Sequence, residues 1–423
     1  MALDMQDIIA NNRPDLAPYQ DLYKWFHANP ELSFQETETA AKIHSELSKL
    51  GSFDLFPRIG KTGLAAVCKN GTGKIVLLRA DIDGLPVEEK TGLEYSSRKT
   101  MQDIEGNEKP VMHACGHDMH ITSLLAAAHL LVKAKDQWTG TLVLVFQPAE
   151  ERGAGAQAMV DDGLYLKVPV PDIVLGGHVM PYRTGTLGTR RGTMACAADT
   201  FAVTLHGRGG HASQPHRTID PVVMAAHIIV RLQTVASRET DPSDHAVVSV
   251  GTVHAGSVEN IISDVAKLSL DIRTLNPKTR DRVLNSVKRI VEAESEASNA
   301  PKPPDFVRTR TFPFLQNDED VTAKLEKSFS EHFPTGENGY SSAALRLGGS
   351  EDFGVLATAV NRPACFWTYG GVDPDVWARA DKHDRILEDI PVNHSPFFAP
   401  VIMPTLQVAT DAYAVAALTW LAR

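Results

Sequence analysis

The chain of 423 residues is 43% hydrophobic and carries a formal charge of −10, which suits a protein of two or three domains with sizeable cores. It contains neither a basic block nor basic–aromatic alternation, so nucleic acid and anionic membranes are not expected partners. Its four cysteines are far apart, which argues against a disulfide scaffold, and no apolar stretch is long enough to span a bilayer. We therefore expect a cytoplasmic protein.

The first part of the chain alternates helical patterns with short apolar strands. The predicted helices cover residues 17–26, 36–50 and 121–135. The predicted strands cover residues 62–69, 74–79, 141–146 and 172–175. The last three strands are continuous apolar runs, as expected for strands that are buried on both faces. This alternation predicts an α/β fold with a mostly parallel sheet.

The segment HACGHDMH, residues 113–120, holds three histidines, a cysteine and an aspartate just before the third predicted helix. We expect it on the loop that leads into the first turn of that helix. Cys115 and His117, with one glycine between them, can turn a thiolate and an imidazole toward one metal ion. The alternative is a surface histidine cluster beside a buried cysteine. Because a chelate needs more ligands, the rest of the chain decides between the two.

Acidic and imidazole side chains follow three of the predicted strands, at their carboxyl ends. These residues are Asp81, Asp83, Glu150, Glu151 and His178. In open α/β sheets, ligands bind at the carboxyl ends of the strands. Each residue alone could be a solvated turn or a structural histidine. Their shared position, together with the Cys-x-His pair, predicts a metal site.

From residue 195 the pattern changes. The expected elements are strands over 200–206, 245–254, 264–273 and 306–311, with helices over 219–235 and 278–297. Their β-α-β-β-α-β order resembles a ferredoxin-like domain. We therefore predict a discontinuous domain of residues 1–194 and 311–423 that carries the metal site, with residues 195–310 as an inserted domain.

At this point the chain resembles the M20 metallopeptidases, and within them the branch of hippurate hydrolases, N-acyl-amino-acid amidohydrolases and auxin-conjugate hydrolases. The motifs that carry the resemblance are residues 26–32, 79–86, 113–120, 147–151 and 209–213, and His394. The resemblance implies a dinuclear metallohydrolase with two divalent metal ions per subunit. Zinc or manganese would be the first choice, and cobalt or nickel would be possible. It also implies that residues 1–194 and 311–423 form the catalytic domain. Residues 195–310 would form a lid or dimerisation domain, through which a homodimer assembles.

The resemblance also implies roles for individual residues. The metal ligands would be Cys115, His117, Glu151, His178 and His394. Glu150 would be the general acid/base. His211 and Asn260 would reach the substrate from the inserted domain, usually across a dimer, with His211 as an oxyanion donor. The chain departs from its relatives at Ser263, where they commonly have proline, but it retains Asn260.

Other polar residues of the motifs are assigned to supporting positions. Peptidase branches have a metal-binding histidine where this chain has Asp81, so a direct ligand role for Asp81 is not expected. Asp83 would orient its neighbours from the second shell. The remaining supporting residues are His113, Asp118 and His120. Arg273 could hold a substrate carboxylate, and an ordinary structural ion pair is an equally open alternative.

The function that follows is metal-dependent hydrolysis of a small-molecule amide, namely an N-acyl amino acid or a similar conjugate. A dipeptidase or carboxypeptidase of the same family is one alternative. An enzyme with Cys115 as its nucleophile is another, but it leaves the two glutamates and His178 unexplained. A non-catalytic relative would have lost a ligand or the glutamate base, and every matched position is present here.

Overall fold

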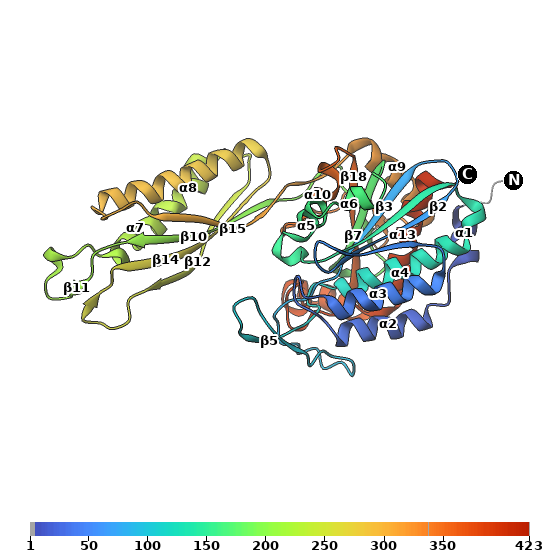
Figure 1. The fold of residues 1–423 in the computed structure, drawn as a ribbon, viewed down its shortest axis with the longest axis horizontal. Coiled ribbons are helices and arrows are strands. Elements are labelled where there is room, and N and C mark those ends of the chain that lie inside the picture. The colour runs from blue at the N-terminus through green and yellow to red at the C-terminus, as the bar shows by residue number, and fades with distance from the viewer. Residues whose placement is uncertain (1–4, 337, 423) are drawn as a thin grey trace. The chain divides into compact units, whose positions relative to one another are not determined.

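The computed structural model describes residues 5–336 and 338–422, and the chain divides into two compact units (Figure 1). The first unit takes its described residues from Met1–Met194, Gln316–Arg346 and Asp352–Arg423. The second consists of Ala195–Leu315 and Leu347–Glu351. It continues beyond residue 310, the end predicted from the sequence, because β15 (Asp305–Phe312) pairs with β10 (Ala197–His206) as far as Phe312.

An eight-stranded mixed sheet is the centre of the first unit. Its strands are β1 (Asp54–Ile59), β2 (Gly63–Asn70), β3 (Ile75–Asp81), β6 (Gly140–Gln147), β7 (Ile173–Arg183), β8 (Leu187–Gly188), β17 (Tyr340–Ser341) and β18 (Ala364–Val372). Across the sheet they run β1-β2-β6-β3-β7-β18-β8-β17. The four central strands β6, β3, β7 and β18 are parallel, whereas β1–β2, β2–β6 and β18–β8 are antiparallel pairs. β8 and β17 form a fourth parallel pair. The α/β class is confirmed, with a mixed sheet whose centre is parallel.

β2 and β3 are neighbours in sequence but not in the sheet, because β6 lies between them. The turn at residues 70–73 therefore does not close a hairpin. Instead, it connects two strands that lie on either side of β6. β3 and β6 are buried along almost their whole length. This burial on both faces is what their continuous apolar sequences predicted.

Helices cover both faces of this sheet (Figure 1). One face carries α3 (Thr37–Leu50), α4 (His117–Lys133), α9 (Glu319–His332) and α13 (Ile402–Leu421), and the other carries α5 (Gly155–Asp161) and α10 (Gly354–Thr358). The remaining helices of this unit are α1 (Met5–Asn12), α2 (Ala17–Ala28), α6 (Leu164–Lys167), α11 (Pro374–Lys382) and α12 (Ile386–Asp389). Within the described residues, no helix has both the length and the apolarity that crossing a membrane requires.

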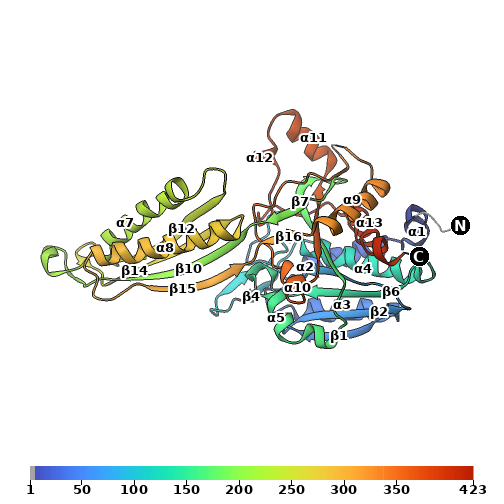
Figure 2. The same cartoon turned by 90° about the horizontal axis from the view of Figure 1, so that it is seen from above.

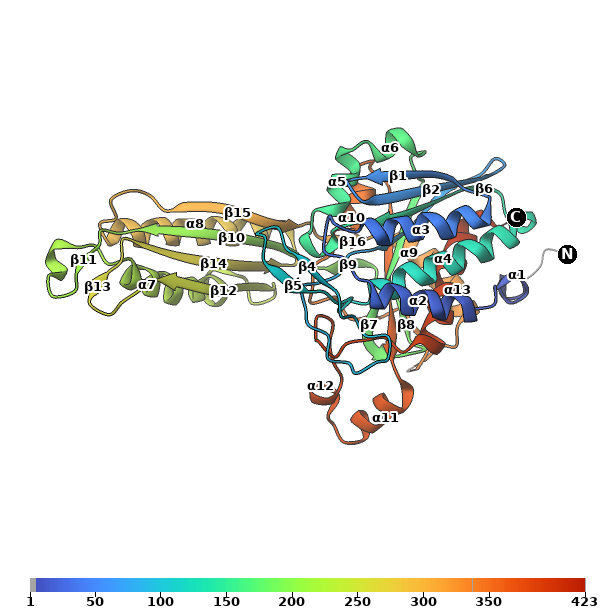
Figure 3. The same cartoon turned by 60° about the horizontal axis from the view of Figure 1, so that its bottom comes forward.

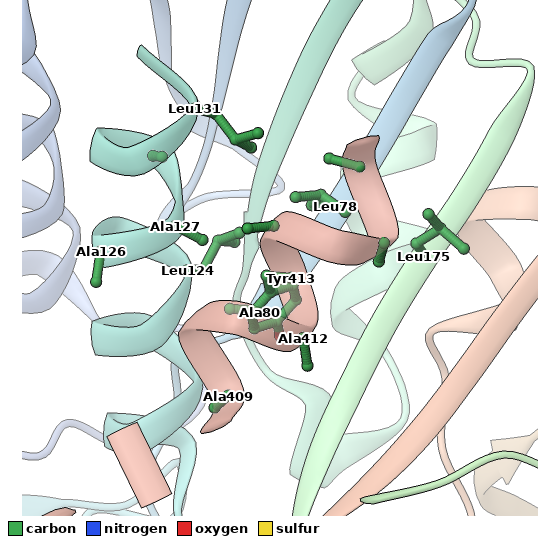
Figure 4. Packing of buried hydrophobic residues seen from close by; sticks show 14 of the residues in the cluster. Leu78, Ala80, Leu124, Ala126, Ala127, Leu131, Leu175, Ala409, Ala412 and Tyr413 are labelled. Atoms are coloured by element: carbon green, nitrogen blue, oxygen red, sulfur yellow. The ribbon is translucent and has the colours of Figure 1, made fainter. Parts of the chain in front are cut away.

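The main core of the first unit lies where α4 and α13 pack together over β3 and β7 (Figure 4). Small side chains such as Ala127, which points from α4 toward α13, let the two helices approach closely. Leu78 of β3 is buried beneath them, and burial of such a side chain contributes about 1.5–3 kcal/mol. The Tyr413 hydroxyl donates to the Arg79 carbonyl oxygen at 2.9 Å, which ties α13 to the sheet.

The second unit is a four-stranded antiparallel sheet with two helices packed on one face (Figure 2). In chain order it contains β10, α7 (Pro221–Thr234), β12 (Ala246–Ala255), β14 (Val265–Thr274), α8 (Pro277–Ala297) and β15. Across the sheet the order is β12-β14-β10-β15. Alternate residues of the strands face the helices and form a separate core with Ile228 of α7 and Val287 of α8. This unit therefore has a hydrophobic core of its own.

Short ribbons of two strands occur as well. They are β4 (Thr100–Gln102) with β5 (Glu108–Pro110), β9 (Gly192–Ala195) with β16 (Leu315–Asn317), and β11 (Gly210–His211) with β13 (Ile261–Ile262). Figure 3 shows the first of them in the long excursion between β3 and α4. All four cysteines are buried and free, which confirms that the chain is not a disulfide scaffold.

Candidate metal centre and active site

The Cys-x-His pair enters α4 through a glycine. The sequence predicts these residues on the loop before the helix. In the structure the helix begins at His117, so His117 and His120 lie in its first turn. Gly116 has a φ of 82°, and a Cβ at this position would lie 2.4 Å from Cγ1 of Val179. Only glycine fits this left-handed and crowded position. The tight turn brings Cys115 and His117 to the same end of the sheet.

The five residues predicted as metal ligands lie together in the first unit. Ligand atoms of Cys115, Glu151 and His394 are all within 4.8 Å of one another. Nε2 of His394 is 3.3 Å from Oε1 of Glu151, and Nε2 of His178 is 3.5 Å from Sγ of Cys115. Nε2 of His117 is 3.9 Å from the same Glu151 oxygen. Segments that are hundreds of residues apart in sequence thus converge on one cluster.

Hydrogen bonds determine which nitrogen of His178 is available to a metal. Its Nδ1 lies 2.7 Å from the carbonyl oxygen of Val179, and a carbonyl can only accept, so Nδ1 carries the proton. Nε2, which faces Cys115, therefore carries the lone pair. Burial lowers the pKa of His178 well below its usual range and keeps the ring neutral. A neutral imidazole whose second nitrogen is hydrogen-bonded is the form that binds metals.

His120 also lies beside the cluster, but both of its nitrogens are used. Nδ1 donates to Asp81 at 2.5 Å, and Nε2 accepts the backbone N–H of Val179 at 2.9 Å. Asp81 in turn receives a hydrogen bond from the buried guanidinium of Arg79 at 2.8 Å. His120 and Asp81 are therefore held by each other and by their neighbours, and both lie next to the cluster.

Negative charge dominates the cluster. Burial, together with the carboxylates of Glu151 and Glu150, raises the pKa of the Cys115 thiol well above its usual range. Burial opposes protonation of His117, but the carboxylates of Asp81 and Asp83 outweigh it and raise the pKa of His117 to about 10.

A divalent cation would remove both effects, because it offsets the carboxylates and displaces protons from the thiol and the imidazole. The available donors are one thiol, three imidazoles and a carboxylate, all of types that zinc and similar ions accept. The donor set therefore fits a metal centre.

The two glutamates follow β6 in a turn that two other carboxylates hold in place. Glu36 accepts the backbone N–H of Ala149, which has a φ of 50°, at 2.8 Å. Asp83 accepts the backbone N–H groups of Glu150 and Glu151, each at 3.2 Å. Asp83 thus lies where it orients both glutamates. Glu36 was not singled out from the sequence, because nothing in its spacing relates it to this turn.

His394 reaches the cluster from the loop that precedes α13. Its backbone N–H donates to the Ala114 carbonyl oxygen at 2.8 Å, and its own φ is 71°. The amide of its neighbour Asn393 donates to the carbonyl oxygens of Cys115 and Val179, each at 3.3 Å. The sequence pointed to His394 but not to a role for Asn393, because spacing does not reveal where an amide side chain points. Asn393 holds this loop against the metal centre.

Behind the cluster, His27 of α2 is buried between two carboxylates. Its Nδ1 lies 2.6 Å from Asp118, in the first turn of α4, and its Nε2 lies 3.0 Å from Glu89. Burial would lower the pKa of His27, but the two hydrogen-bonded carboxylates outweigh burial and raise it to about 9. His27 is therefore an imidazolium at neutral pH. It ties α2, α4 and the excursion after β3 together.

We expect this imidazolium to stabilise the first unit at neutral pH and to lose that effect as the pH becomes alkaline. The pKa of an unfolded histidine is about 6.5. The contribution of His27 is thus fully present below that pH and is lost as the pH rises through about 9. At about 1.4 kcal/mol per pKa unit, the loss is on the order of 3 kcal/mol. Urea unfolding of the wild type and of His27→Gln, at about pH 6 and about pH 9.5, measures it.

The stability gap between wild type and His27→Gln should be large at the lower pH and small at the higher one. His383→Gln, which changes an exposed histidine of the same unit, is the matched control and should show no such gap. An equal gap at both pH values would contradict the assignment of a charged His27.

His211 and Asn260 lie together in the second unit, and both are exposed. His211 pairs with Ile261 in the ribbon formed by β11 and β13. The backbone N–H of Ala212 donates to the carbonyl oxygen of Asn260 at 3.0 Å. One ribbon therefore presents both of the side chains that the sequence assigned to the substrate.

Arg273, on β14, forms an ion pair within the second unit. Its Nε is 2.9 Å from Asp271, and its Nη1 is 3.3 Å from the carbonyl oxygen of Gly348. The structural ion pair, one of the two alternatives for Arg273, is therefore present. A contact between Arg273 and a substrate carboxylate stays a prediction.

Residues 77–392 match the family described as Peptidase family M20/M25/M40. The chain belongs to this family. A hippurate hydrolase of Campylobacter jejuni is 37% identical over 80% of this chain and 84% of its own length. The IAA-amino acid hydrolase ILR1-like 5 of Arabidopsis thaliana is 36% identical over 90% of this chain and 86% of its own.

Among solved structures, a dinuclear metal-binding peptidase of the M20 family from Bacillus subtilis superposes with a TM-score of 0.73 at 27% identity. The match covers 95% of this chain and 97% of that one. Membership of the M20 family and the identity with these relatives make the protein an amidohydrolase, an enzyme that acts on amide bonds. Together with the buried cluster, they also make it a metal-binding protein.

Proposed function

We propose that the protein hydrolyses the amide bond of N-acyl amino acids or similar small amide conjugates, with two divalent metal ions in each subunit. The observation that carries the proposal is the convergence of one thiol, three imidazoles and a carboxylate in a negatively charged cluster, in which the His394 side chain alone is largely exposed. The ligands would be Cys115, His117, Glu151, His178 and His394. Zinc or manganese is proposed first, with cobalt or nickel as alternatives. The cytoplasm is the proposed compartment.

Glu150 is the proposed general acid/base. The metal ions, when bound, supply Lewis acidity and water whose pKa is lowered toward neutrality. Glu150 would take a proton from the attacking water and pass it to the nitrogen of the departing amine, so that the proton is conserved over the reaction. Asp83 holds the backbone N–H groups of both glutamates. The 3.3 Å between Oε1 of Glu151 and Nε2 of His394 supports the assignment of Glu151 as the ligand.

The second unit is proposed to be a ferredoxin-like lid and dimerisation domain. Two features support an interface there. β12 lies at an edge of its sheet, and Val223 and Val230, seven residues apart on α7, are 53% and 72% exposed. In such a homodimer, His211 would donate to the carbonyl oxygen of a substrate in the neighbouring subunit's site. Asn260 and Arg273 would contact the rest of the substrate.

Complementation between inactive subunits should test the shared site. A mixture of His211→Ala and Glu150→Gln, allowed to exchange subunits, should regain activity, because each mixed dimer would contain one intact centre. Removal of one oxyanion donor typically costs about 10²–10³ in turnover, so the background is low. The control is either variant alone after the same treatment. If exchange is demonstrated and no activity returns, His211 does not act across a dimer.

The substrate class is tested with a panel of amides. Purified protein supplied with manganese, zinc, cobalt or nickel is assayed for release of the free amino acid from N-acetyl, N-benzoyl and longer N-acyl amino acids. Dipeptides with a free amino terminus test the alternative of a dipeptidase or carboxypeptidase. Hydrolysis of the acylated compounds alone is expected. Hydrolysis of the dipeptides alone would overturn the proposed substrate class and leave the metal centre intact.

A further inference from the structure

The ring of His211 is held by a residue two positions along the chain. Its Nδ1 lies 3.1 Å from the backbone nitrogen of Ser213 and 2.8 Å from the Ser213 hydroxyl oxygen. A backbone N–H can only donate, so Nδ1 must accept and must carry the lone pair. In the neutral ring the proton is then on Nε2, on the other side of the imidazole.

The ribbon around His211 fixes its backbone but not its ring. Gly210 pairs with Ile262, His211 pairs with Ile261, and Ala212 donates to the Asn260 carbonyl oxygen. These contacts place the Cα of His211 and leave its side-chain torsions free to choose among rotamers. The two hydrogen bonds from Ser213 act on the ring itself. They select both its tautomer and its orientation.

We propose that Ser213 is a positioning residue that holds His211 with its proton on Nε2, ready to donate to the carbonyl oxygen of the amide. The inference rests on the proposed role of His211 as an oxyanion donor. With the opposite tautomer, the ring would present a lone pair to an oxygen that gains negative charge, and it would repel that oxygen. The backbone N–H of Ser213 can only donate and so works against that tautomer, and with the lone pair on Nδ1 the hydroxyl adds a second donor to it.

Substitutions at this position separate the hydroxyl from the backbone. Ser213→Ala removes the hydroxyl and keeps the N–H, whereas Ser213→Thr keeps both donors. Ser213 is exposed, so neither change removes buried packing. The loss of one net hydrogen bond predicts a fall in kcat of about 2- to 10-fold in Ser213→Ala, with KM nearly unchanged. Ser213→Thr should restore kcat.

The matched control is Ser237→Ala. Ser237 is an exposed serine of the same unit, and its hydroxyl bonds to the Gln233 carbonyl oxygen within a helix. This variant should keep the kcat of the wild type.

The tautomer is read directly by ¹⁵N NMR of the full-length protein labelled in its histidines. The signals of His211 are assigned by their disappearance in His211→Ala. In the wild type we expect Nδ1 to be unprotonated and Nε2 protonated. In Ser213→Ala the Nδ1–H tautomer should gain population, and it should return to the wild-type level in Ser213→Thr.

A wild-type ring with its proton on Nδ1 would overturn the proposal. So would a Ser213→Ala variant in which kcat falls without a change of tautomer, or the tautomer changes without a fall in kcat. If His211→Ala loses activity while Ser213→Ala keeps it, only the role of Ser213 fails. Full activity of His211→Ala would instead overturn the proposed function of His211, on which the inference depends.

Discussion

Glu150→Gln is expected to lower kcat by about 10²–10⁴-fold or more while the protein keeps its metal, because an amide cannot take up the proton that the carboxylate carries. The substitution preserves the size of the side chain and the backbone hydrogen bond from residue 150 to Asp83. The turn after β6 should therefore keep its geometry. Steady-state kinetics and metal analysis of the same preparation measure the two effects together.

Glu151→Gln is the matched variant, one residue away in the same turn. Its carboxylate faces His394 at 3.3 Å, so we expect loss of bound metal in addition to loss of activity. The adjacent glutamates thus give opposite results in metal analysis. Retention of metal by Glu151→Gln together with its loss in Glu150→Gln would mean that the base and the ligand must be exchanged.

Removal of metal should abolish hydrolysis, and addition of a divalent ion should restore it. The reason is that the bound ions would supply the Lewis acidity and the activated water on which the proposed reaction depends. Metal should also stabilise the fold, by about 2.7 kcal/mol at a hundred times its Kd. Thermal unfolding of chelator-treated and metal-supplied protein measures this effect independently of activity.

Cys115→Ser should retain metal more weakly than the wild type, because a hydroxyl is a poorer ligand than a thiolate. The control is Cys365→Ser, at a cysteine that is equally free but lies in β18 within the core of the first unit. That variant should lose stability and keep its metal stoichiometry. Full activity in protein verified to contain no metal would refute the metal-dependent mechanism.

Much of the fold could be predicted from the sequence because its patterns are local. The apolar runs of β3 and β6 and the capped helix α3 follow from the sequence within a few residues. The order of the strands does not, because the insertion of β6 between β2 and β3 depends on pairing across long stretches of chain. The predicted start of α4 was wrong. The polar residues of its first turn are buried beside the metal ligands, and no helical periodicity marks them in the sequence.

The convergence of the thiol, imidazole and carboxylate side chains could be predicted, but not the residues that hold them in place. Thiol and imidazole side chains near strand ends are conspicuous in a sequence. A supporting contact, such as Asn393 to the Cys115 carbonyl oxygen or Glu36 to Ala149, joins segments with no common pattern. His178 shows a further limit. It was expected at the end of a strand, but β7 continues to Arg183. His178 lies two residues beyond Gly176, the last residue of β7 that pairs with β3.

The position of β18 has a consequence for how the protein is made. In the sheet this strand lies between β7 and β8, although it follows both of them in the chain by the whole second unit. At about 5–20 residues per second, a ribosome needs roughly 10 to 35 s to proceed from the end of β7 to β18. During that interval the apolar edge of β7 has no partner. An uncovered edge of this kind invites pairing with other nascent chains until the C-terminal segment arrives to cover it.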